Sequence, residues 1–179
     1  LVKTLTTIQE SFDRSGRSGG GDTDRYFRLA NEQLLRNALD LLLIARPKES
    51  LSVRALFDVI MSAPTNPEQV DSEAWQQRSI CYRLLDEALN RDSVSAQQRS
   101  DLSITGRYFL QEFPSLPQDT RGSIVSTFTT MADVFLRGEI GNLFSTGLNI
   151  VPEVTHEGAV IVVDLPVTEF RQVGIAAQT

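Results

Sequence analysis

The sequence predicts a mainly α-helical fold, a multi-helix bundle followed by one C-terminal strand. Apolar residues recur three and four positions apart through most of the chain, and Ser, Asp, Pro and Gly stand where these runs begin and end. Only the stretch from His156 to Pro166 differs. Its residues Ala159 to Val163 are all apolar and mostly β-branched, which is typical of a strand buried on both faces.

The first 22 residues predict a helix and a loop. Leu1, Leu5, Ile8 and Phe12 share one helical face, so residues 1–13 are expected to form a leading helix. Residues 14–22 contain Arg-Ser-Gly-Arg-Ser-Gly-Gly-Gly, a composition that predicts a flexible loop.

A helical domain is predicted over residues 23–148, and its longest helix comes first. Asp22 or Thr23 is expected to cap a helix that reaches Arg46 and stops at Pro47. Its apolar face is wide, which predicts a central position in the core: Phe27, Leu34, Leu35, Ala38, Leu39, Leu42 and Leu43.

Four further segments of this domain have the pattern of helices. Ser52 is expected to cap Val53–Met61, with a turn between Pro64 and Pro67. A second helix is predicted from Ser72 to Leu89, with these apolar members: Trp75, Ile80, Leu84, Leu85, Ala88 and Leu89. A third is expected to be capped by Ser95 and to reach Phe113. A fourth is predicted from Arg121 to Leu136, with Asp119 or Thr120 as its cap and Gly138 at its end. Glu139–Phe144 is expected to add one short turn of helix.

The predicted strand has no partner in the sequence. Burying each of its side chains contributes about 1.5–3 kcal/mol, but each unpaired buried backbone group costs about 1–3 kcal/mol. We therefore expect residues 149–179 to be a return segment whose strand, residues 159–165, belongs to a sheet formed outside this sequence. Both chain ends, Leu1 and Thr179, read as cut points within helices.

Composition favours a cytoplasmic protein without a membrane span. The most apolar run, Ala38 to Ala45, is short and interrupted by Asp40, whereas a span needs about 20 apolar residues. Cys81 is the only cysteine, so no internal disulfide can form. No secretory leader pattern precedes the first helix.

Charge restricts any nucleic-acid contact to one part of the chain. The net charge is −6, which disfavours a polyanion-binding surface over the whole molecule. Between Arg14 and Arg54, however, eight basic residues face five acidic ones, a surplus of three. Nucleic-acid contact is therefore considered for Arg14, Arg17, Arg25, Arg28 and Arg36, against the simpler interpretation of a solvated helix face.

Several single residues could take part in catalysis or metal binding, but the sequence shows no partner residues near them. Gly19–Gly21 precedes a helix but has no Walker A lysine, and Asp164 follows the strand without the Glu of a Walker B pair. His156 has no second metal ligand nearby, and Cys81 lies among apolar residues as a packed side chain. A hydrolase or transferase that uses Asp164 and His156 is the least favoured interpretation, and no catalytic, cofactor-binding or metal residue is assigned.

Several strings resemble one family. They are Tyr26-Phe27 to Leu43, Ile60-Met61-Ser62-Ala63-Pro64-Thr65, Ile124 to Gly138, Leu143-Phe144-Ser145-Thr146, His156-Glu157-Gly158 and Val162 to Pro166. Together they resemble the type IV secretion and conjugation coupling proteins of the TraD and TrwB type. Those proteins are hexameric, membrane-tethered ATPases related to the FtsK and HerA motors, and they move DNA or protein into a secretion channel.

The resemblance implies a place for both parts of the chain. In that family a helical all-α domain is inserted in a RecA-like nucleotide-binding domain, to whose sheet the chain returns through a strand, here Ala159–Val163. ATP and Mg²⁺ are then implied for the parent protein, tethered to a bacterial inner membrane, and not for this chain, which has no membrane contact of its own. The implied partners are the rest of the ATPase, DNA, relaxosome proteins or effectors.

A second function remains open on the residues alone. The chain could be a free-standing helical adaptor that completes a partner's sheet with its single strand. The residues that flank Leu1 and Thr179 in the gene discriminate between the two, because a motor requires a phosphate-binding loop upstream and an Asp-Glu strand end downstream.

Overall fold

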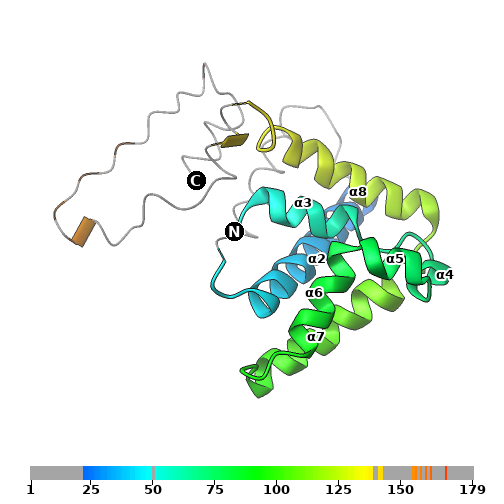
Figure 1. The fold of residues 1–179 in the computed structure, drawn as a ribbon. Helices are drawn as coiled ribbons and strands as arrows, with labels where there is room; N and C mark the ends of the chain where they lie inside the picture. The colour runs from blue at the N-terminus through cyan, green and yellow to red at the C-terminus, as the bar shows by residue number, and fades with distance from the viewer. Residues whose placement is uncertain are drawn as a thin grey trace.

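The helices pack around one long central helix. The computed structural model describes residues 22–49, 51–138, 141–142, 155–156, 158, 160, 162 and 168. Within these ranges every regular element is helical, which confirms the mainly α fold (Figure 1). Insertion in a RecA-like domain stays a prediction.

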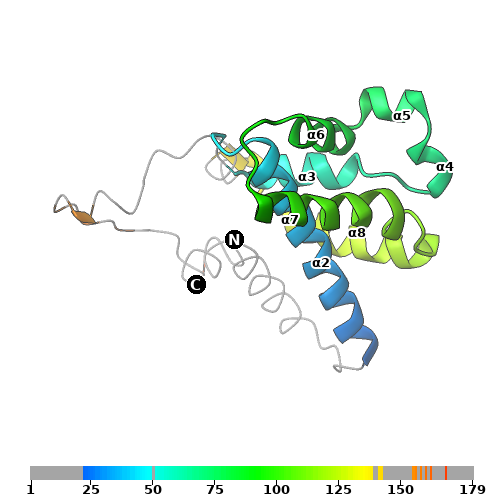
Figure 2. The ribbon, with the colours of Figure 1, turned by 90° about the horizontal axis from the view of Figure 1, so that it is seen from below.

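Helix α2 (Asp22–Ala45) forms the axis of the bundle. It contacts α3, α6, α7 and α8, and its middle turns carry the fully buried Leu34, Leu35, Ala38 and Leu41. Its N-terminal half projects away from α3 and α6 in Figure 2. At the other end, Nη1 of Arg91 donates to the carbonyl of Ile44 at 2.7 Å, which satisfies an acceptor that the helix end leaves open.

Helix α3 (Val53–Met61) begins as the sequence predicts. The side chain of Ser52 accepts a hydrogen bond from the amide of Ala55 at 3.1 Å, so it is the N-cap. The helix buries Val53, Leu56, Val59 and Ile60 against α2, α6 and α8.

The single helix predicted from Ser72 to Leu89 is wrong. The chain forms a short α4 (Pro67–Val70), then α5 (Glu73–Arg78) and α6 (Ile80–Leu89). Ser79 is extended between the last two, with φ −75° and ψ 123°, and its hydroxyl oxygen accepts from the amide of Tyr82 as the N-cap of α6. The same hydroxyl donates to the carbonyl of Ser62 at 2.7 Å, so a contact to the end of α3 fixes the break.

The helix predicted between Ser95 and Phe113 changes from an α-helix to a π-helix in its last turn. Helix α7 (Ala96–Arg107) starts with a capping box between Ser95 and Gln98. It continues as a π-helix, η1 (Tyr108–Glu112), in which the amide of Phe113 donates to the carbonyl of Tyr108 at 2.8 Å. The wider turn brings Tyr108, Phe109 and Phe113 together, with ring centroids 5.3–6.4 Å apart.

Helix α8 (Gln118–Asp133) is shifted from the predicted Arg121–Leu136. It ends earlier because the amides of Phe135 and Leu136 bond three residues back, to Ala132 and Asp133, in a tighter turn. Gly138 then has φ 58°, a left-handed conformation that favours glycine. Gly141 and Asn142 are helical, within the predicted Glu139–Phe144 turn.

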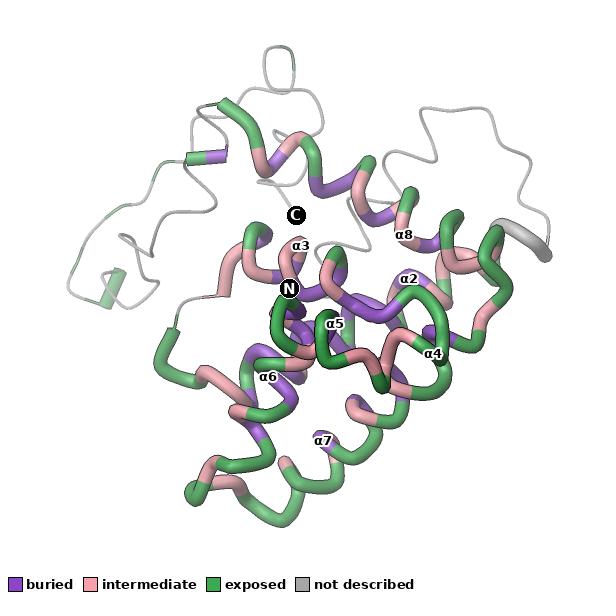
Figure 3. Tube along the Cα trace, turned by 45° about the vertical axis from the view of Figure 1, so that its right-hand side comes forward, coloured by how far each residue is buried: buried purple, intermediate pink, exposed green. Residues whose placement is uncertain are grey.

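The core contains most of the predicted apolar residues, and the helices expose their outer faces to solvent (Figure 3). Two core predictions are wrong. Leu43 is 46% exposed because it lies two turns beyond Arg36 on the solvent face of α2, and Leu89 is 72% exposed because it is the last residue of α6.

Several predictions fall outside the described residues. They include the leading helix, the Gly/Ser loop and most of the strand predicted over residues 159–165. Of that strand, Val160 and Val162 are described; neither lies in a strand in this structure, and they are 88% and 82% exposed. Across the described ranges, the structure contains no helix with the length and apolar character needed to cross a membrane.

Candidate functional site

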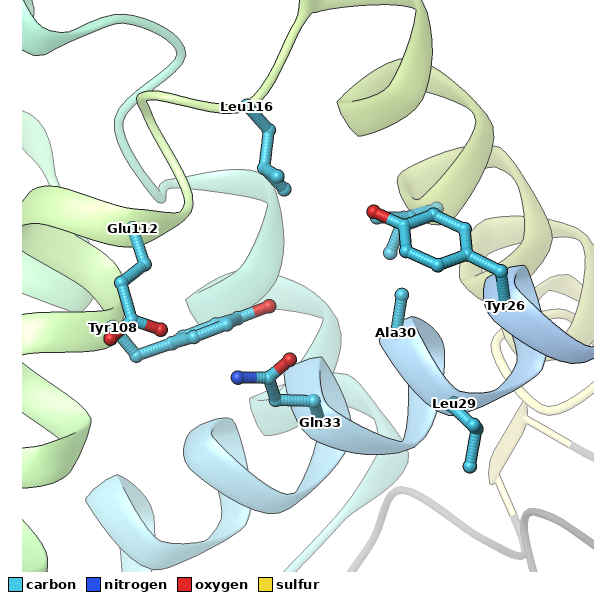
Figure 4. Close-up of a pocket in the computed structure, with 8 residues that line it drawn as sticks. Tyr26, Leu29, Ala30, Gln33, Tyr108, Glu112 and Leu116 are labelled. Atoms are coloured by element: carbon cyan, nitrogen blue, oxygen red, sulfur yellow. The ribbon is translucent and has the colours of Figure 1, made fainter.

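A cavity of about 200 Å³ opens between the N-terminal half of α2, η1 and the start of α8. We call it the tyrosine pocket, and its lining residues are Tyr26, Leu29, Ala30, Gln33, Tyr108, Glu112, Leu116 and Ile124. Figure 4 shows the side chains of Tyr26 and Tyr108 entering from different sides, with both hydroxyl groups directed into the space between them. The Gln33 amide lies below the Tyr108 ring tip. The pocket therefore combines an apolar lining with several polar groups.

Helical geometry explains why these residues meet. Tyr26, Leu29, Ala30 and Gln33 lie three and four positions apart, so they share one side of α2. An α-helical turn of about 100° per residue would separate Phe113 from Tyr108 by about 140° around the axis. The π-helix lets Phe109 and Phe113 enter the core while the Tyr108 ring reaches the pocket. π-turns of this kind are frequent at functional sites.

Tyr108 is the buried polar residue of this pocket. It is only 4% exposed, and its hydroxyl makes no hydrogen bond to another residue in the part of the chain that the structure describes. Burial raises the pKa of the Tyr108 phenol, and the nearby charge of Glu112 and the Tyr26 phenol raise that pKa further. The phenol therefore stays protonated at neutral pH and can both donate and accept a hydrogen bond.

A second, larger cavity continues along α2 toward α7. Its volume is about 470 Å³, and we call it the acidic cavity because Glu32, Asp40 and Asp101 line it with Arg36 as the one basic member. Leu29 and Gln33 line both cavities, so the two cavities adjoin along α2, and we call the pair the groove. Exposed Leu29 and Ile104, 51% and 53% accessible, supply apolar surface there.

The acidic side chains of the second cavity influence one another. Burial raises the pKa of the Asp40 carboxyl, the charge of Asp101 raises it further, and the guanidinium of Arg36 lowers it. Two carboxylates thus share a region with one neutralising cation, and the cavity carries a net negative charge.

The described arginines considered for nucleic acid lie on α2. Arg25 and Arg36 are exposed and, eleven positions apart, lie on the same side of the helix, whereas Arg28 is half-buried. Within the described ranges, none of the three forms an ion pair. Arg36, however, lines the acidic cavity, where neighbouring carboxylates would compete with a phosphate for the Arg36 guanidinium. Arg14 and Arg17 lie outside the described residues, so contact by this set stays a prediction.

Two other basic residues of the same region have structural partners. Arg46 forms a two-point contact with Glu87, with Nε at 2.8 Å from Oε2 and Nη2 at 2.9 Å from Oε1, and it also contacts Glu49 at 3.3 Å. Arg54 donates to the carbonyl of Leu136 at 3.2 Å. The basic surplus counted from the sequence is therefore partly used to hold helices together.

The remaining candidates have simple structural outcomes. Cys81 is fully buried, and burial raises its pKa to about 12, which confirms a packed side chain. His156 is exposed, while Gly19–Gly21 and Asp164 lie outside the described residues. Within the described part of the chain, no group of three or more His, Cys, Asp or Glu residues is arranged to hold a metal ion.

The groove was not found from the sequence. From the sequence, Tyr108 is an apolar member of the helix predicted after Ser95, and Tyr26 has no assigned role. Nothing in the local pattern indicates that positions 26 and 108 meet. A weak signal was present at residues 108–113, where three aromatic residues cannot share one face of a regular α-helix.

Comparison of the chain with protein-family models, with curated proteins and with solved structures finds no significant match. The site must therefore be interpreted from its own chemistry.

Proposed function

We propose that this chain is the non-catalytic helical domain through which a type IV secretion or conjugation coupling ATPase recognises its substrates or partners. The observation that supports recognition is the groove of two adjoining cavities along α2, which apolar side chains line together with phenol, amide and carboxylate groups. Such a surface is suited to binding another macromolecule. The link to a coupling ATPase rests on the resemblance in sequence.

In this proposal ATP hydrolysis belongs to sequence outside the 179 residues. We expect the purified chain neither to bind nor to hydrolyse ATP, because it contains no Walker A lysine or Walker B Asp-Glu pair. Magnesium-dependent ATP turnover by the purified chain would falsify the non-catalytic assignment.

The recognition role is tested in the intact parent protein. Replacement of residues 22–138 by a short Gly/Ser linker is expected to abolish transfer of DNA or effector protein while ATP turnover by the remaining domain persists. Transfer at the normal rate without the helical domain would overturn the proposal. Loss of ATP turnover would instead assign the domain a structural role in the motor.

Nucleic acid is one partner that the resemblance implies, and α2 offers a direct test. If Arg25 and Arg36 contact phosphates, then changing both to Gln should reduce the slope of log affinity against log salt by about 1.4 for single-stranded DNA, or about 0.7 per lost contact. Arg78→Gln is the matched control, since Arg78 is exposed on α5 and forms no ion pair within the described ranges. An unchanged slope removes α2 from the list of DNA contacts.

The alternative, a free-standing adaptor, draws support from a different observation. Val160 and Val162 are apolar but almost fully exposed, as expected for a segment whose covering partner is another chain or domain. Lys at both positions should abolish partner binding by an adaptor. In the coupling ATPase the same double substitution should instead destabilise the motor domain itself.

A further inference from the structure

The Tyr108 hydroxyl is directed into the tyrosine pocket (Figure 4). Only 4% of the residue is exposed, so the phenol oxygen at the tip of the ring is the part of Tyr108 that a ligand in the pocket can reach. Figure 4 shows it facing the same space as the Tyr26 hydroxyl and the Gln33 amide. A ligand in the pocket can therefore exchange hydrogen bonds with these polar groups.

The charge around the groove selects the kind of ligand. Glu112 lines the tyrosine pocket, and Glu32, Asp40 and Asp101 line the cavity that continues from it, whereas Arg36 is the one basic lining residue. Four carboxylates against one guanidinium give the lining residues a formal charge of −3, or −2 when the Arg107 guanidinium paired with Glu112 is counted. The Glu112 carboxylate is also shared, since its Oε1 accepts from Nε of Arg107 at 2.9 Å in an exposed ion pair. Exposed pairs of this type are weak, so Glu112 can turn toward an incoming cation.

We propose that the tyrosine pocket binds an arginine or lysine side chain of a protein partner, on a segment whose apolar residues pack against Leu29 and Ile104. The two phenol rings offer π faces to a cation, and their hydroxyl oxygens and the Gln33 carbonyl accept its N–H groups. Glu112 supplies the opposite charge. The aliphatic part of the basic side chain contacts the apolar lining, including Ala30 and Leu116.

The groove as a whole fits a peptide segment better than a single small molecule. The tyrosine pocket, at about 200 Å³, has room for one side chain, and the adjoining cavity of about 470 Å³ extends past it along α2. Leu29 and Ile104 are exposed on this path and would be covered by apolar residues of the segment. A nucleic acid is disfavoured at the same place because its phosphates would meet four carboxylates.

This inference rests on the proposed recognition function for the identity of the partner, but its test uses the chain alone. Three fluorescently labelled peptides are compared by anisotropy: an amphipathic peptide with leucines and one central arginine, the same peptide with citrulline, and the same peptide with glutamate. Citrulline keeps the shape of arginine and removes its charge. We expect the arginine peptide to bind, the citrulline peptide to bind about tenfold more weakly, and the glutamate peptide not to bind.

Variants of the chain locate the contact. Glu112→Gln should weaken the arginine peptide about fivefold to tenfold and should lower its salt dependence, because one charge of the pair is removed. Tyr108→Phe keeps the ring and removes only the hydroxyl, so a loss of about threefold to tenfold is expected. Glu73→Gln is the matched control, since Glu73 is exposed on α5 and lines neither cavity, and it should leave binding unchanged.

The outcomes separate this inference from the proposed function. Equal binding of the arginine and citrulline peptides, tighter binding of the glutamate peptide, or an effect of Glu73→Gln as large as that of Glu112→Gln overturns the basic-side-chain site. If the peptide results are as expected but Glu112→Gln leaves substrate transfer by the parent ATPase unchanged, then the site stands and its role in the coupling protein is refuted.

Discussion

A cluster of hydrogen bonds around Ser62 joins α3 to the α5–α6 break. The Ser62 hydroxyl oxygen accepts from the amide of Cys81 at 2.9 Å, and the hydroxyl donates to the carbonyl of Val59 at 3.1 Å. The Ser62 carbonyl accepts from Nε1 of Trp75 at 3.0 Å and from the hydroxyl of Ser79 at 2.7 Å. This cluster fixes the start of α6 against the end of α3.

Ser62→Ala removes only the hydroxyl contacts. The Cys81 amide then lacks an acceptor at a residue that is fully buried, which costs about 1–3 kcal/mol, and the Val59 carbonyl loses its donor. We expect the free energy of unfolding to fall by about 2 kcal/mol. At about 4 °C per kcal/mol for a domain of this size, Tm should fall by about 8 °C.

The assay is urea unfolding followed by circular dichroism and by fluorescence of Trp75, the single tryptophan of the chain. Ser103→Ala, an exposed position in α7, is the control and should change stability by less than about 0.5 kcal/mol. Trp75→Phe removes one donor to the Ser62 carbonyl and should cost about 1 kcal/mol by circular dichroism. A Ser62→Ala variant as stable as the Ser103→Ala control would refute the role assigned to this cluster.

Three further predictions concern single side chains. Asp40→Asn should raise stability by about 0.5 kcal/mol at neutral pH, because a raised pKa makes the charged carboxylate unfavourable in the fold; the gain should vanish below the unfolded pKa of about 4. Glu87→Gln should do the opposite, since the hydrogen bond from Arg46 lowers the pKa of Glu87, so a loss of about 1 kcal/mol near neutral pH should disappear as pH falls through that lowered pKa. Both are read from urea midpoints against pH, and slopes of the same sign would contradict the assignments. Cys81 should react with a thiol reagent only as fast as the protein opens, whereas labelling at the rate of a free thiol would contradict its burial.

Where a helix begins could be predicted because the signal is local. Ser52 and Ser95 accept hydrogen bonds from amides three residues ahead, and the sequence indicates both caps directly. The long apolar face of α2 was also predicted, because seven spaced apolar residues leave few other ways to bury them. Leu43 was misassigned since spacing alone does not say how wide the buried face is.

The breaks in the helices could not be predicted because they depend on distant residues. Ser79 interrupts a run that is otherwise helical in pattern, and its reason is the carbonyl of Ser62, 17 residues earlier in the chain. The π-turn at Tyr108–Glu112 similarly depends on how Phe109 and Phe113 fit the core. Neither contact has a signature in the residues next to it.

The candidate site shows the same limit more strongly. Counting charges predicted a basic face from Arg14 to Arg54, but in the folded chain Arg46 is paired with Glu87, and Arg36 lines a cavity that also contains carboxylates from two helices. Asp101 comes from α7, so no reading of α2 alone could have given the sign of charge in this groove. The nucleic-acid hypothesis came from counting charges along the sequence. The basic-peptide hypothesis comes from the charges that the fold brings together around the groove.

Under the proposed function, the two halves of α2 have different roles: the C-terminal half belongs to the core and the N-terminal half lines the recognition groove. Its C-terminal half carries Leu41, Leu42 and Ile44 in the core and ends in contacts to Arg91, so substitutions there should act on stability. Its N-terminal half keeps Tyr26 and Leu29 about half exposed beside a groove, although an isolated domain could bury more apolar surface there. Exposed apolar side chains contribute little to stability, and under the proposed function this surface is kept for a partner.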